Sequence, residues 1–215
     1  MTRRQNWRVA GLAALSVLTL LGCGKDHGTG SSSNAPLFTY NAQQNNGRTI
    51  RWPNLPVRVF LGGNVARADE VNIWTQETSG AVTFAFVGSA GAANITFGFQ
   101  SATDVCGVTF VDFDDNGNMT SAETRVSQSI YRGPQCEQTV THETAHAIGF
   151  LGHTHDGGLM DPDGGNGEIT PLVVQVLSDL YHLPPGTNVS SEAKAFGLRK
   201  PGGRTRLTFV YPVRR

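Results

Sequence analysis

The stretch from His142 to Met160 gathers side chains that can bind a metal ion. Its sequence, HETAHAIGFLGHTHDGGLM, contains His142, His146, His153 and His155, in a chain with only six histidines. A histidine near neutral pH is largely uncharged, and a ring nitrogen can then donate its lone pair to a metal. The stretch therefore predicts a metal site.

His142 and His146 are four residues apart, which places both rings on one face of a helix. Both can then bind a single ion, at about 2.0 Å if the ion is zinc. The carboxylate of Glu143, next in the sequence, can reach a water on that ion without binding the ion itself. The His-Glu-x-x-His pattern thus predicts two metal ligands and a general base, which suits hydrolysis by an activated water.

The residues after this pattern predict a turn back toward the metal. Gly149 follows His146 by three residues, and glycine tolerates the left-handed conformation that commonly ends a helix. A catalytic zinc usually has three protein ligands. His153 and His155 both lie where the returning chain can supply the third.

This series of residues resembles the metzincin clan of zinc peptidases, whose signature is His-Glu-x-x-His-x-x-Gly-x-x-His followed by a methionine-containing turn. The closing Gly-His-Thr and Leu-Met-x-Pro runs look most like the matrixin branch of the clan. The resemblance implies that His142 and His146 bind zinc, that Glu143 is the base and that Met160 is the methionine of the turn.

One position departs from the clan pattern, which places the third histidine at 152. Here that residue is Gly152, and His153 follows it. A loop beside glycines can absorb one extra residue, whereas an insertion in a helix rotates everything after it by about 100°. We therefore expect His153 to be the third ligand, with His155, Asp156 or a water as the alternatives.

The resemblance implies hydrolysis of peptide bonds in a protein or peptide substrate. Glu143 would take a proton from the water on the zinc and pass it to the leaving amine. In the clan the substrate lies extended against an edge strand, and we expect that edge at residues 124–130. The alternatives are a catalytically idle metzincin-fold surface binding protein, a hydrolase of non-peptide amides and a structural zinc site. Glu143 favours the enzyme, since a binding protein needs no base.

Residues 112–123 match the spacing of a calcium-binding loop. The candidate Ca²⁺ ligands are Asp112, Asp114, Asn116 and Glu123, the last in the twelfth place. The flanking residues 108–113 and 124–130 indicate strands, whereas an EF-hand loop lies between helices. A hairpin turn explains the same residues, and both interpretations stay open.

The N-terminus is typical of a signal peptide. Three arginines precede an apolar run at 9–21, which is shorter than the roughly 20 residues that span a bilayer. The run ends in Leu-Leu-Gly-Cys and resembles the lipobox of bacterial lipoproteins, which implies cleavage after residue 22 and a lipid on Cys23. Gly24 is not the aspartate that retains such proteins in the inner membrane, so this resemblance favours the outer membrane, with simple secretion as the alternative.

The remaining cysteines agree with export, and the charge does not indicate a nucleic-acid partner. If Cys23 carries lipid, Cys106 and Cys136 are left as a pair, and we predict a disulfide between them in an oxidising compartment. The formal net charge is zero, and no basic cluster outside the N-terminus indicates nucleic-acid binding. We expect a monomer that contacts a membrane only through its lipid.

Hydrophobic periodicity places these motifs on elements of an α+β protein. We expect a metzincin-like zincin fold: a twisted, mostly antiparallel-edged sheet with an active-site helix and a C-terminal helix. The domains expected are a signal peptide at 1–22, a flexible tether at 23–35, a catalytic domain at 36–187 and a tail of unknown role at 188–215. The expected strands are 57–60, 82–87, 95–99, 108–113, 124–130 and 207–211, and the expected helices are 66–78, 137–149 and a final one that begins at Pro171.

Overall fold

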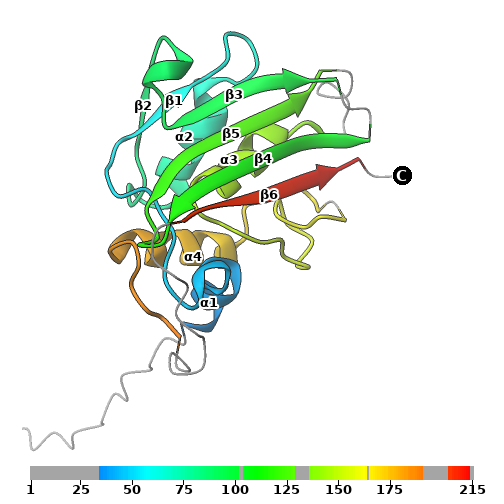
Figure 1. Cartoon of the computed structure of the whole chain (residues 1–215). Coiled ribbons are helices and arrows are strands. Elements are labelled where there is room, and N and C mark those ends of the chain that lie inside the picture. The colour runs from blue at the N-terminus through cyan, green and yellow to red at the C-terminus, as the bar shows by residue number, and fades with distance from the viewer. Residues whose placement is uncertain (1–33, 102–103, 129–135, 164, 191–202, 214–215) are drawn as a thin grey trace, which may run out of the picture. The chain divides into compact units, whose positions relative to one another are not determined.

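The computed structural model describes residues 34–101, 104–128, 136–163, 165–190 and 203–213 (Figure 1). The predicted signal peptide, Cys23 and nearly all of the predicted tether lie outside the described residues. Within the described part, no helix is both long and apolar enough to cross a membrane.

The described residues form a mixed α/β structure, consistent with the predicted α+β class. Its helices are α1 (Ala35–Tyr40), α2 (Ala68–Glu77), α3 (Thr139–Ala147) and α4 (Pro171–His182), with short 3₁₀ turns at Ala42–Asn45 and Ala90–Ala92. Its strands are β1 (Val57–Phe60), β2 (Phe84–Phe86), β3 (Ile95–Gln100), β4 (Val105–Asp114), β5 (Met119–Ser127) and β6 (Arg204–Pro212).

The described strands form one sheet in the order β2-β1-β3-β5-β4-β6. Pairing is parallel from β2 to β5 and antiparallel at β4 and β6. The prediction that residues 124–130 form the substrate edge was therefore wrong, because β5 pairs with β3 on one side and with β4 on the other. Alternation along a strand reports which face is buried, but it does not report the neighbours of the strand.

Strand β6 lies in the segment that the sequence separates as a tail. It pairs antiparallel with β4, in a register that runs from Asp114 opposite Arg204 to Val105 opposite Pro212. In Figure 1 it is the strand at the edge of the sheet, beside β4. Part of the predicted tail thus forms a strand of the same sheet as β1 to β5.

Helices α2 and α3 pack against one face of the sheet, and α4 packs with α1 (Figure 1). Helix α4 begins as predicted, with Pro171 in its first turn, and it buries Val173, Val176, Leu177 and Leu180 at helical spacing. The inward residues of the strands meet these helices in one core, which includes Val59, Ile95, Phe97, Val111 and Phe113.

The structure joins Cys106 to Cys136 in a disulfide, which is the pairing predicted from the sequence. Their Cα atoms are 5.3 Å apart. Because Cys106 belongs to β4 and Cys136 precedes α3, the bond ties the strand and the helix together close to the candidate site.

Candidate metal centre

Helix α3 carries the His-Glu-x-x-His pattern, and every one of its residues is buried. The helix ends at Ala147, and Gly149 follows with a φ of +110°, the conformation expected for a chain that turns back. The carbonyls at this end receive hydrogen bonds from Trp52 Nε1 to Ala147 and from the Tyr181 hydroxyl to Ile148. These bonds fix the position of the helix end.

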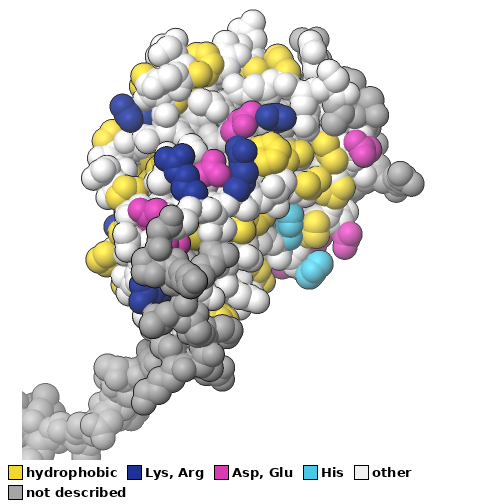
Figure 2. All heavy atoms as spheres, viewed as in Figure 1, with side chains coloured by type: hydrophobic (Ala, Val, Ile, Leu, Met, Phe, Trp, Pro, Cys, Tyr) yellow, Lys and Arg dark blue, Asp and Glu magenta, His cyan; other side chains and the backbone are white. Residues whose placement is uncertain are grey.

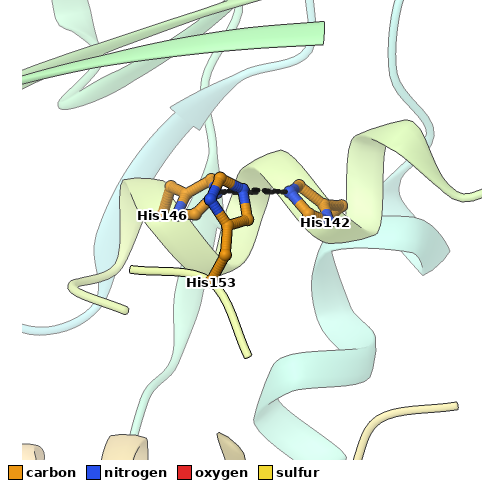
Figure 3. A group of neighbouring side chains, drawn as sticks. All are labelled: His142, His146 and His153. Carbon is orange, nitrogen blue, oxygen red and sulfur yellow. Dashed lines mark hydrogen bonds between the residues drawn. The ribbon is translucent and has the colours of Figure 1, made fainter. Parts of the chain in front are cut away.

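His142, His146 and His153 point their Nε2 atoms at one another (Figure 3). The Nε2 of His142 lies 3.2 Å from that of His146 and 3.3 Å from that of His153. The third distance, from His146 to His153, is 3.3 Å. We call these three nitrogen atoms the histidine triangle.

Backbone carbonyls fix the orientation of the two helical rings. His142 Nδ1 lies 2.7 Å from the carbonyl oxygen of Leu159, and His146 Nδ1 lies 2.7 Å from that of Phe150. A carbonyl can only accept, so each Nδ1 carries the proton and each Nε2 keeps its lone pair for a metal. Both rings are therefore oriented and protonated as metal ligands require.

Burial also keeps the rings uncharged. It lowers the pKa of His142 to about 3 and the pKa of His146 well below its ordinary value of 6.5. Burial lowers the pKa of His153 as well, although this ring is only partly buried. A neutral imidazole is the form that binds a metal.

Glu143 is fully buried between α3 and β4. The Thr109 hydroxyl donates to Glu143 Oε2 at 2.6 Å, and Oε1 has no hydrogen-bond partner among the described residues. A Cβ at Gly107 would lie 2.5 Å from Oε1, so the carboxyl group packs directly on the backbone of β4. Burial raises the pKa of Glu143 to about 8, and the Thr109 hydrogen bond only partly opposes this shift.

The two rivals of His153 lie elsewhere. His155 is exposed, and its ring groups with Asp161 and Asp163 rather than with His142 and His146. Asp156 accepts hydrogen bonds from Thr154, Gly158 and Thr170. The structure thus brings His153, rather than His155 or Asp156, to the helical pair.

Met160 is fully buried, next to the residue whose carbonyl holds His142. Its own carbonyl accepts a hydrogen bond from the Thr154 amide. This hydrogen bond connects Met160 to the loop that carries His153.

The four candidate calcium ligands belong to the β4–β5 hairpin. Asp114 Oδ1 accepts hydrogen bonds from the amides of Asn116 and Asn118, which is the pattern of a tight turn. Asp112 and Glu123 form ion pairs with Arg206. The acidic side chains do not form a candidate metal-binding group among the described residues.

Two aromatic rings of β6 lie flat on the histidines. Tyr211 stacks on His142 with ring centroids 4.0 Å apart, and Phe209 stacks on His146 at 4.5 Å. Figure 2 shows histidine side chains reaching the surface beside a run of hydrophobic side chains. The β-rich run at 207–211 predicts a strand, but nothing in the sequence predicts its contact with the histidines.

A separate cavity of about 580 Å³ opens beside the N-terminal half of α3. It contains none of the candidate ligands, and acidic side chains dominate its charged lining: Asp69, Glu70, Glu77, Glu137 and Glu168, with Arg67. It is therefore distinct from the histidine triangle.

Comparison of the sequence with models of known protein families gives no match, and comparison with curated proteins gives none either. The case for a function thus depends on the geometry of the site.

Proposed function

We propose that this chain is a zinc-dependent endopeptidase with a metzincin-like fold. The histidine triangle is the observation that carries the proposal, because His142, His146 and His153 can hold a metal ion together. The chain order of strand, helix, further strands and ligand-bearing helix supports the likeness to the clan.

The dimensions of the triangle suit zinc. Three nitrogen ligands about 2.05 Å from a tetrahedral zinc ion lie about 3.3 Å from one another. The nitrogens here are separated by 3.2 to 3.3 Å. Three neutral imidazoles leave a fourth position open, as catalytic rather than structural zinc sites do.

A zinc ion bound by these residues supplies two effects, the acidification of a water and the polarisation of the scissile carbonyl. Glu143 then acts as the proton carrier. Thr109 holds one oxygen of its carboxyl group, while the other has no partner among the described residues and can accept a proton.

The second candidate is a catalytically idle binding protein with the same fold. The observation that favours it is the stacking of Phe209 and Tyr211 on the ligand rings, which covers the helical pair. Such a protein can bind zinc without needing the carboxyl group of Glu143. The two candidates therefore differ in what the loss of that group does.

The test is Glu143→Gln, with zinc content and cleavage of a peptide library measured on the same preparation. We expect the variant to retain one zinc per chain and to lose cleavage by about 10²- to 10⁴-fold, because the proton carrier is removed. Glu77→Gln, at an exposed glutamate of α2, is the matched control and should behave as the unaltered chain. Cleavage by Glu143→Gln at the full rate of Glu77→Gln would contradict the enzymatic proposal.

A further inference from the structure

Strand β6 crosses the candidate site as an extended peptide would. Thr109 and Gly107 of β4 contact Glu143, and the residues opposite them in β6 are Phe209 and Tyr211. These are the same two residues whose rings lie on His146 and His142. A chain that pairs with this edge of β4 thus passes directly over the ligands and the carboxyl group.

Backbone pairing with a sheet edge is a common way for a protein to bind an extended peptide. Strand β6 already takes this position on β4, with paired residues from Val105 to Asp114. Two chains cannot pair with one edge at the same place, so a peptide can reach the site along β4 only when β6 has left.

We propose that β6 is an internal occupant of a peptide-binding edge on β4 and that it holds the chain in a latent form. The proposal rests on the proposed function for the role of the site. The substrate of the chain is then an extended peptide that competes with residues 204–212 for pairing with β4. Departure of β6 exposes the edge together with the histidine triangle.

The attachment of β6 suits reversible release. Among the described strands, β6 pairs with β4 alone, so its departure leaves the order β2-β1-β3-β5-β4 intact. On the outer face, Arg206 reaches Asp112 and Glu123 at 3.4 and 3.6 Å. All three side chains are at least partly exposed, and exposed ion pairs hold only weakly.

A removable disulfide tests the proposal on the full chain. Val108 of β4 lies opposite Val210 of β6, one residue away from the aromatic pairs and on the outer face. Facing residues of antiparallel strands are close enough for a disulfide, so Val108→Cys with Val210→Cys should tie β6 to β4. The control is Val108→Cys with Arg125→Cys, which ties the same residue of β4 to β5 instead.

Both disulfide variants also carry Glu143→Gln, so that binding is measured without cleavage. The probe is a fluorescent peptide with the sequence of residues 204–212, RTRLTFVYP, and a scrambled peptide is the control. We expect the closed β4–β6 disulfide to weaken binding of the probe by about tenfold or more, because the bond keeps β6 next to β4 and raises its effective concentration at that edge. Mild reduction should restore binding, whereas the β4–β5 disulfide should have no effect.

Leu207→Pro provides a second variant. Alternate residues of a strand direct their amides to the same side, and the Val213 amide donates to Asp104 on the β4 side, so proline at 207 removes a donor to β4. We expect this variant to bind the probe more tightly than the unaltered chain, with circular dichroism to verify that it is folded. Equal binding of the probe to the closed and reduced β4–β6 disulfide forms would overturn the proposal.

The same disulfide variants with Glu143 restored separate this proposal from the proposed function. If the disulfide controls probe binding but no form cleaves peptides, the occupant role of β6 stands and the peptidase fails. If cleavage occurs at one rate with the disulfide open or closed, the peptidase stands and the occupant role fails.

Discussion

The histidine triangle and the β4–β5 hairpin both match short metal-binding patterns, but they fold differently. At the triangle, three nitrogen atoms converge, and backbone carbonyls orient two of the rings from behind. At the hairpin, Asp114 binds the amides of its own turn, while Asp112 and Glu123 pair with Arg206. Spacing along the chain therefore identifies candidate metal ligands. What distinguishes a true ligand group from a turn is that its nitrogen or oxygen atoms converge with lone pairs that no other group uses.

The largest effect expected from this comparison concerns the third ligand. His153→Ala should weaken zinc binding by more than about 100-fold, since even loss of a residue behind a ligand commonly costs 10- to 100-fold. His155→Ala should change it little, because His155 is exposed and outside the triangle. Competition with a chromophoric chelator measures both affinities. Strong binding in His153→Ala together with weak binding in His155→Ala would reverse the assignment.

Much of this site could be predicted from the sequence because its geometry is local. A spacing of four residues fixes two rings on one helix face, and Gly149 ends that helix where the sequence indicates. The place of His153 was harder to predict, because the loop absorbs one residue more than the clan pattern has.

Long-range pairing could not be predicted in the same way. The run at 207–211 indicates a strand, but nothing in its alternation says that it pairs with β4 or that Phe209 meets His146. Helix α1 was also missed. So was a hydrogen bond next to it, in which Asn41 Nδ2 donates to the Gly149 carbonyl at 2.8 Å. Such contacts depend on residues far apart in sequence, whereas periodicity reports only local burial.

The stability of the metal-free protein should depend on pH, because the histidines of the triangle and Glu143 have shifted pKa values. Burial lowers the pKa of His142 and His146, so below pH 6.5 the unfolded chain binds more protons through these rings and stability falls as the pH drops. Burial raises the pKa of Glu143 to about 8, so its contribution is lost as the pH rises toward that value. We expect stability to be greatest near pH 6.5.

Urea denaturation of the metal-free chain from pH 5 to 8 measures this profile. Between pH 6.5 and pH 8, Glu143 should lower the free energy of unfolding by at most about 2 kcal/mol, and Glu143→Gln should remove this decline. A decline that persists unchanged in Glu143→Gln would assign it to another group.

The hydrogen bond that Trp52 makes to the end of α3 should contribute moderately to stability. Trp52→Phe removes the donor to the Ala147 carbonyl at the end of α3, and we expect a loss of about 1–3 kcal/mol because that buried carbonyl is left unpaired. Trp74→Phe is the matched control. Its partner is the Thr141 carbonyl, which also has a partner within the helix, so its loss should be smaller. Equal losses in thermal denaturation would indicate that ring volume alone matters.

The smallest effect should come from the hairpin. Asp114→Ala removes the acceptor of two turn amides near the surface, and we expect it to cost about 0.5–1.5 kcal/mol of stability without changing zinc content. Calcium titration of the zinc-loaded chain and of this variant provides the contrast. Calcium binding that Asp114→Ala abolishes would show that the hairpin is a metal site after all.

X-ray absorption at the zinc edge, on the full chain loaded with one equivalent of zinc, tests the central claim most directly. The histidine triangle predicts about three imidazole nitrogens at about 2.0 Å from the ion, with oxygen completing the coordination. A spectrum with one imidazole or none, or a chain that retains no zinc after dialysis, would contradict the claim that His142, His146 and His153 form one zinc site.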